Sequence, residues 1–301
     1  MQETNFCLNP NQTKALELDR CFPDTVLMST ANPKPLAIFS DLDGTLLDHR
    51  SYSFAPAQDA LAEAARGHVP VILASSKTAA EIAPLRSDLG LEGWPAIVEN
   101  GAGLLPAGAS DACDGRQAEN VGGRQDVLRR LESLPIALRK RFAGFTEWGT
   151  AEIAQRTGLS MAEAERANTR AFSEPGEFTG DSSDFARFVA ALAERGVQAQ
   201  RGGRFVALSL GADKAQRMRE VLALLGFASR AETYVLALGD GENDIAMLEF
   251  ADLGVVIANP AHAPLPRLAS EQAWRILRTR SVGPAGWNAC VLAVLRAKAG
   301  L

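Results

Sequence analysis

Two aspartates, Asp41 and Asp43, stand two positions apart at the end of an apolar run, within FSDLDGTLLD at residues 39–48. Repulsion between their charges makes the pair a poor choice for a purely structural turn. A bound cation would offset that repulsion, and acid/base chemistry would use it by keeping one carboxyl group ionised and the other protonated. Gly44 follows the pair and lets the backbone turn tightly, so that amide groups can face an anion.

Other polar residues also follow apolar runs. They are Ser75, Ser76 and Lys77 at the end of the run 69–75, and Asp240, Asn243 and Asp244 at the end of the run 234–240. In an open α/β sheet, ligands bind beyond the carboxyl ends of the strands. We therefore expect these side chains to meet Asp41 at one edge of a sheet, although they are far from it in sequence. Several carboxylates there would form an oxygen-only site of the kind that suits Mg²⁺.

The elements that must position these residues alternate between strand and helix at both ends of the chain. Strands are expected at 36–41, 69–75, 95–100, 234–240 and 253–259, and helices at 57–68, 78–90, 213–226 and 244–251. Pro84 is expected to kink or shorten the second helix. This alternation predicts an α/β fold with a doubly wound, mostly parallel, Rossmann-like core.

The middle of the chain breaks this rhythm. Helices are expected at 124–134, 161–168 and 181–196, and a strand at 203–210. We interpret residues 105–208 as an inserted α+β cap domain, between core segments 35–104 and 209–301. Residues 1–34 end in the linker-like STANPKP at 29–35 and are expected to be a loosely ordered extension.

Composition excludes several classes of protein. The formal net charge of -5 argues against nucleic-acid binding, and no stretch reaches the roughly 20 apolar residues of a membrane span. The four cysteines are widely spaced without a CxxC pair, which predicts reduced thiols in a cytoplasmic protein. None of the three histidines lies in a nucleophile–base pattern. There is also no GxxxxGK motif of a P-loop and no GxGxxG after the first strand.

From residue 36 onward the sequence resembles the haloacid dehalogenase-like phosphohydrolases. DLDGTL at 41–46 matches their first motif and GDGEND at 239–244 their fourth, with Ser75 and Lys214 at the positions of the second and third. The resemblance implies that Asp41 is the nucleophile that forms an aspartyl-phosphate and that Asp43 is the general acid/base.

The same resemblance assigns the remaining roles. Ser75 would donate to a phosphoryl oxygen, and Lys214 would neutralise developing charge. The implied cofactor is Mg²⁺, bound by the side chains of Asp41 and Asp240 and the backbone carbonyl of Asp43, with Asp244 supporting the metal site.

Within the superfamily, the sequence resembles the type-two cap sugar phosphatases and, among these, the mannosyl-3-phosphoglycerate phosphatases. The segments on which this second resemblance rests are VILASSKTAAEI (71–82), VENGAGL (98–104), AFSEPGEF (171–178), GGRFVALSLGADK (202–214) and RTRSVGPAGW (278–287). The implied reaction converts 2-(α-mannosyl)-3-phosphoglycerate to mannosylglycerate, a compatible solute. The candidate substrate-binding residues are Ser76, Lys77, Glu99, Asn100, Ser173, Glu174, Arg204 and Asn243.

Several alternatives stay open at this point. The catalytic residues do not separate a mannosyl substrate from glucosyl-3-phosphoglycerate or sucrose-phosphate, nor Mg²⁺ from Mn²⁺. A non-catalytic binding protein on the same scaffold is a further alternative, although Asp41, Asp43, Lys214 and Asp240 are all present. The expected partner is a small phosphorylated sugar-glycerate, with no nucleic acid and no membrane, and the protein is expected to be a monomer or a dimer. Trp287 is expected in the core rather than stacked on a sugar.

Overall fold

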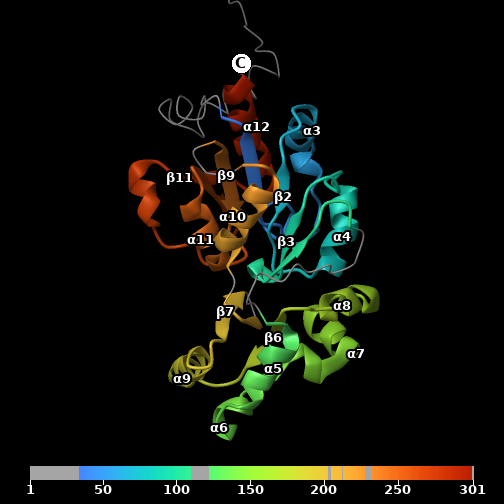
Figure 1. The fold of residues 1–301 in the computed structure, drawn as a ribbon, viewed down its shortest axis with the longest axis vertical. Helices are drawn as coiled ribbons and strands as arrows, with labels where there is room; N and C mark the ends of the chain where they lie inside the picture. The colour runs from blue at the N-terminus through green and yellow to red at the C-terminus, as the bar shows by residue number, and fades with distance from the viewer. Residues whose placement is uncertain (1–33, 110–121, 203–204, 212, 228–231, 300–301) are drawn as a thin grey trace, which may run out of the picture.

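The computed structural model describes residues 34–109, 122–202, 205–211, 213–227 and 232–299 (Figure 1). Arg204 and residues 1–33 lie outside this part of the chain. The described residues form a larger body that contains the parallel sheet and a smaller body that contains residues from the middle of the chain. None of the described helices combines the length and apolar character that crossing a membrane requires.

The larger body is built on a sheet whose neighbouring strands are all parallel in the described residues. In spatial order its strands are β11 (Ile276–Val282), β10 (Leu253–Ala258), β9 (Tyr234–Gly239), β1 (Leu36–Ser40) and β2 (Val71–Leu73). A short antiparallel pair, β3 (Ala96–Val98) and β4 (Gly103–Leu105), lies beside β2 and is linked to it by a bridge between Ala74 and Ile97.

Helices cover both faces of this sheet (Figure 1). They are α3 (Gln58–Arg66), α4 (Ala79–Asp88), α10 (Lys214–Leu224), α11 (Ile245–Phe250) and α12 (Gly283–Ala299), with short 3₁₀ turns at η1 (Ala55–Ala57), η2 (Glu99–Gly101), η3 (Glu242–Asp244) and η4 (Ala269–Ala273). Because side chains alternate along a strand, Ile38 packs in the cluster formed with α3, α4 and α12. Phe39 packs in the cluster formed with α10 and α11. The expected α/β class with a mainly parallel sheet is confirmed.

We call the smaller body the cap, and it is built on an antiparallel sheet. Its strands are, in spatial order, β5 (Phe142–Gly144), β6 (Ser173–Phe178), β8 (Phe205–Ser209) and β7 (Gln198–Gly202). Its helices are α5 (Arg124–Glu132), α6 (Ile136–Arg139), α7 (Phe145–Thr157), α8 (Met161–Asn168) and α9 (Ser182–Ala193). A hydrophobic cluster of its own, which includes Phe142, Phe188 and Leu208, lies between the sheet and its helices.

Some elements have no counterpart in the expectation from sequence. Strand β7 (QAQRG) carries no apolar run, and α7 is interrupted at Gly149, whose φ is +67°. Strand β11 lies at the sheet edge and is largely exposed, so its sequence ILRTRSV shows no continuous apolar pattern. Pro84 does not end α4, which runs from Ala79 to Asp88 with the proline inside it.

Trp287, in α12, belongs to the core as expected. Its side chain is fully buried, and its Nε1–H donates to Ser40 Oγ at 2.9 Å. This hydrogen bond joins α12 to the last residue of β1, immediately before Asp41. The tryptophan therefore has a structural place beneath the candidate site.

Candidate active site

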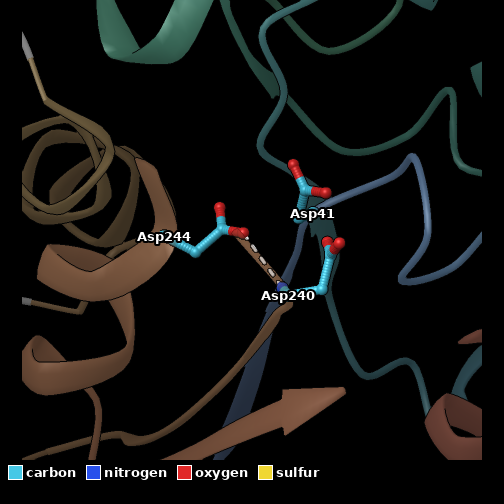
Figure 2. A group of neighbouring side chains, drawn as sticks. All are labelled: Asp41, Asp240 and Asp244. Carbon is cyan, nitrogen blue, oxygen red and sulfur yellow. Dashed lines mark hydrogen bonds between the residues drawn. The ribbon is translucent and has the colours of Figure 1, made fainter. Parts of the chain in front are cut away.

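Three buried aspartates meet where neighbouring strands end (Figure 2). Asp41 follows β1 and Asp240 follows β9, and these two strands are hydrogen-bonded neighbours in parallel register. Asp244 comes from η3, a few residues further along the chain. One carboxylate oxygen from each lies within 4.8 Å of the others. The structure thus brings together residues that the sequence places about two hundred positions apart.

Lys214 supplies a positive charge to this cluster. It is the first residue of α10, and its helix is capped by Asp213, whose carboxylate accepts from Gln216 N at 2.6 Å. Lys214 Nζ lies 2.6 Å from Asp41 Oδ1 and 2.6 Å from Asp244 Oδ1, and the side chain is fully buried. Burial alone would lower the pKa of Lys214, but the charges of Asp244 and Asp41 outweigh it and raise the pKa above its ordinary value. The lysine is therefore held as a cation.

Asp244 uses both oxygens within the protein. Oδ1 accepts from Lys214, and Oδ2 accepts from the backbone amides of Asp240 at 3.1 Å and Gly241 at 3.0 Å. Figure 2 shows the contact between Asp244 and the Asp240 amide. These bonds close the loop that carries both aspartates. Asp244 consequently holds Asp240 and Lys214 in place from behind the cluster.

Asp240 is oriented by three residues that sequence reasoning did not single out. Thr45 Oγ1 donates to Oδ1 at 2.8 Å, Asn259 Nδ2 donates to Oδ2 at 2.7 Å, and His262 Nε2 lies 2.8 Å from the same oxygen. Asn259 ends the apolar run 253–259, so the rule that located Asp41 and Asp240 could have found it. His262 lies in the loop after β10, and no sequence pattern marks it.

The backbone at Gly44 requires the absence of a side chain. Its φ is +86°, and an added Cβ would lie 2.9 Å from Asp240 Oδ2 and would also clash with the amide of Asn259. Glycine adopts this conformation without steric cost. The loop after β1 can therefore pass directly against Asp240 and the Asn259 side chain that orients it.

Asp43 is paired with Lys77. Lys77 Nζ lies 2.9 Å from Asp43 Oδ2 and 5.4 Å from the centre of the Tyr52 ring. Burial alone would lower the pKa of Lys77, but the charges of Asp43 and Glu81 outweigh it and raise the pKa. The other oxygen, Asp43 Oδ1, is buried and has no hydrogen-bond partner among the described residues. A buried polar atom without a partner is uncommon and suits a group that acts on a substrate.

Ser75 lies two residues after the end of β2, the strand next to β1. The amide of Ala74 donates to Ser40 O at 2.8 Å, which places Ser75 beside the start of the Asp41 loop. The hydroxyl of Ser75 accepts from the amide of Lys77 at 3.2 Å, and the residue is buried. This contact leaves the hydroxyl proton of Ser75 available for donation.

The expected substrate-binding residues have varied surroundings. Asn100 and Asn243 meet, with Asn243 Nδ2 donating to Asn100 Oδ1 at 3.2 Å. Ser76 is exposed, and its carbonyl accepts from the guanidinium of Arg170 in the cap. Ser173 Oγ donates to Glu99 Oε2 at 2.6 Å.

The two expected glutamates are buried and fully occupied by protein groups. Glu99 accepts from residues 171–173 of the cap. Glu174 accepts from Arg124 Nε at 2.6 Å, Thr146 N at 2.8 Å and Thr146 Oγ1 at 2.9 Å. Both carboxylates thus stabilise the cap or its contact with the core in this arrangement.

The aspartate cluster fits a hard divalent cation such as Mg²⁺. All of its donors are carboxylate oxygens, the ligands that Mg²⁺ prefers. Burial, followed by the charges of Asp244 and Asp240, raises the pKa of Asp41 well above its usual range, although Lys214 acts in the opposite direction. A cation between Asp41 and Asp240 would remove this repulsion. Asp41 and Asp240, which follow the neighbouring strands β1 and β9, are the residues that could hold it.

This fold and this site define a class of protein. The family model for haloacid dehalogenase-like hydrolases matches residues 38–110 and 161–269, which is more than half of the chain. The chain therefore belongs to the haloacid dehalogenase-like hydrolases, as the motifs at 41–46 and 239–244 led us to expect.

Solved structures with the same fold include sugar phosphatases. A sucrose-phosphatase from Synechocystis, determined with sucrose and phosphate, is 16% identical with a TM-score of 0.60 and covers 87% of this chain and 98% of its own. A phosphatase of the superfamily from Bacteroides thetaiotaomicron is 18% identical with a TM-score of 0.62, covering 88% and 97%. A protein from Thermoplasma acidophilum is 18% identical with a TM-score of 0.61, covering 87% and 98%. At these identities the similarity demonstrates the shared fold.

Proposed function

We propose that this hydrolase is a Mg²⁺-dependent phosphatase that converts 2-(α-mannosyl)-3-phosphoglycerate to mannosylglycerate and phosphate. The observation that carries the phosphatase part is the position of Lys214 Nζ, 2.6 Å from Asp41 inside the buried aspartate cluster. A fixed cation beside a buried carboxylate is suited to a phosphoryl group, whose negative charge must be balanced before a second anion can attack it.

In the first step an oxygen of Asp41 attacks phosphorus, the bond between phosphorus and the glycerate oxygen breaks, and an aspartyl-phosphate forms. Asp43 gives a proton to the departing oxygen, a role that its unpartnered Oδ1 supports. In the second step Asp43 takes a proton from water, which attacks phosphorus and restores Asp41. Lys214 and the Ser75 hydroxyl face the phosphoryl oxygens. Mg²⁺, held by Asp41 and Asp240, would supply further charge neutralisation.

The substrate assignment rests on the sequence resemblance to mannosyl-3-phosphoglycerate phosphatases and on the cap. We assign residues 105–208 as the cap domain, between core segments 35–104 and 209–301. Cap residues lie against the loop that follows Ser75, because Arg170 binds the carbonyl of Ser76. A cap in this place can exclude water and select the leaving group. The substrate carries a phosphate and a carboxylate, and Arg204 and Lys77 are the cations that we assign to the carboxylate.

Phosphate release from a panel of substrates tests the proposal. The panel contains the mannosyl and glucosyl phosphoglycerates, sucrose-phosphate and glucose 6-phosphate, each with Mg²⁺. We expect the highest kcat/KM with the mannosyl compound. A second candidate is sucrose-phosphate, because a sucrose-phosphatase shares the fold over 87% of this chain. A preference for that substrate or for a simple hexose phosphate would refute the mannosyl assignment. Release of no phosphate from any member of the panel would favour a non-catalytic binding protein.

A further inference from the structure

The turn Glu99–Gly101 (η2) has a left-handed backbone at three consecutive residues. The φ angles are +49° at Glu99, +58° at Asn100 and +96° at Gly101. Residues other than glycine rarely adopt this conformation, and it persists only where surrounding contacts enforce it. The turn is therefore held in place by its neighbours, and those neighbours indicate what it does.

On one side, the turn holds the loop that carries Ser75. The amide of Glu99 donates to Lys77 O at 2.9 Å, and the amide of Asn100 donates to Ser75 O at 2.8 Å. These bonds fix the backbone on both sides of Ser76. The position of the Ser75 hydroxyl thus depends on the left-handed turn.

On a second side, the turn holds the cap. The Glu99 carboxylate accepts from the amides of Ala171 at 2.9 Å, Phe172 at 3.2 Å and Ser173 at 2.8 Å, and from Ser173 Oγ at 2.6 Å. The side chain is almost fully buried, so these bonds satisfy an anion that has little access to water. Glu99 thus forms a buried set of hydrogen bonds from the core to residues 171–173 of the cap, at the start of strand β6.

On a third side, the turn contacts the segments that carry Lys214 and Asp244. Gly101 packs so closely on the start of α10 that an added Cβ would lie 2.8 Å from Lys214 N. Arg217 Nε donates to Gly101 O at 3.0 Å, and Asn243 Nδ2 donates to Asn100 Oδ1 at 3.2 Å. One short turn therefore touches the cap and the backbone near three residues of the candidate active site.

We propose that the turn Glu99–Gly101 couples the seating of the cap to the alignment of Ser75 and Lys214, and that Glu99 is the positioning residue of this coupling. The proposal rests on the proposed phosphatase function. Glu99 acts through the backbone of the turn and not by contact with the reacting atoms. When residues 171–173 bind its carboxylate, the left-handed conformation is stabilised, and the loops on its other sides are held with it.

The deciding variant is Glu99→Gln, which removes the charge and places an NH₂ group opposite backbone donors. The assay uses p-nitrophenyl phosphate, whose leaving group has neither sugar nor glycerate for the cap to recognise. Coupling predicts a loss of about tenfold or more in kcat even for this small substrate. The matched control is Asp184→Asn, which neutralises a buried cap carboxylate paired with Arg141 at 2.8 Å, away from the turn. It should leave kcat for p-nitrophenyl phosphate within twofold of the wild type.

Hydrogen exchange supplies a readout that needs no activity. In Glu99→Gln we expect faster exchange at the amides of residues 171–173 and also at the start of α10, residues 215–217. Faster exchange at 171–173 alone, with kcat for the small substrate within twofold of wild type, would mean that Glu99 only attaches the cap, and it would overturn the proposal. If the wild type hydrolyses neither p-nitrophenyl phosphate nor 2-(α-mannosyl)-3-phosphoglycerate, the proposed function fails. Hydrogen exchange at residues 215–217 in Glu99→Gln still decides whether the turn couples the cap to α10.

A milder variant covers the case in which Glu99→Gln does not fold. Ser173→Ala removes the 2.6 Å hydroxyl contact to Glu99 and the 2.9 Å bond from Arg170 to the same hydroxyl, and it keeps the three amide bonds to Glu99. We expect a three- to fivefold loss of kcat for p-nitrophenyl phosphate and faster exchange at 215–217. Wild-type values for both measurements in Ser173→Ala would overturn the proposal.

Discussion

Lys77 Nζ lies 2.9 Å from one oxygen of Asp43, while the other oxygen of that carboxylate is buried without a hydrogen-bond partner among the described residues. The lysine thus fixes the orientation of the residue to which we assign proton transfer. It comes from the loop after β2, whereas Asp43 comes from the loop after β1. The contact therefore depends on the parallel pairing of those two strands.

Replacing Lys77 tests this contact. Lys77→Met keeps the length of the side chain but removes the charge, so the Asp43 carboxylate loses its partner and its fixed orientation. We expect kcat to fall about 10- to 100-fold, which is less than the roughly 10²–10⁴-fold that a positioned acid/base group contributes, because Asp43 itself remains. Initial-rate kinetics with p-nitrophenyl phosphate measure the effect, and Lys140→Met on the exposed cap surface is the control. An unchanged kcat would show that Asp43 needs no partner.

Replacing the nucleophile gives the largest effect. Asp41→Asn keeps the shape of the side chain but cannot form the aspartyl-phosphate, so phosphate release should fall by about 10³-fold or more, comparable to the loss of other catalytic nucleophiles. Asp88→Asn, at an exposed carboxylate in α4, should behave as wild type. Release by Asp41→Asn at the wild-type rate would exclude the proposed nucleophile.

Mg²⁺ should stabilise the folded protein because its ligands converge only in the folded state. At a free concentration of one hundred times its dissociation constant, a ligand of the native state adds about 2.7 kcal/mol to the free energy of unfolding. We expect Mg²⁺ to raise the melting temperature and EDTA to reverse the rise. Asp240→Asn should lose most of this shift, while Asp88→Asn should keep it. An equal rise in melting temperature with Mg²⁺ in the wild type and in Asp240→Asn would show that Asp240 is not a ligand of the stabilising metal ion.

Gly44 should tolerate no side chain. In Gly44→Ala the added Cβ meets Asn259 and Asp240, and the backbone keeps its left-handed conformation at a cost of about 1–2 kcal/mol. We expect a loss of at least that size in the free energy of unfolding, measured with urea, together with reduced activity. Gly93→Ala is the control, since an added Cβ there has no atom within 4 Å and its φ is not left-handed. Equal stability of the two variants would contradict the argument.

Local patterns predicted much of the fold. The apolar runs that became β1, β9 and β10 are continuous because both faces of a parallel sheet are buried, and this kind of run is readable without tertiary information. Strands β7 and β11 were not predicted from the sequence. Each lies at the edge of its sheet, and an edge strand is stabilised by its backbone pairing, which does not require a run of apolar side chains.

For the site, the resemblance to the four motifs of the haloacid dehalogenase-like hydrolases predicted Asp41, Asp43, Ser75, Lys214 and Asp240 as candidate residues. Position in sequence says nothing about which side chains already have partners. The tertiary structure decided that Glu99 and Glu174 bind protein donors and that His262 and Asn259 orient Asp240. The physical reason is that hydrogen bonding between distant segments depends on distance and direction, which exist only once the sheet and the cap have packed.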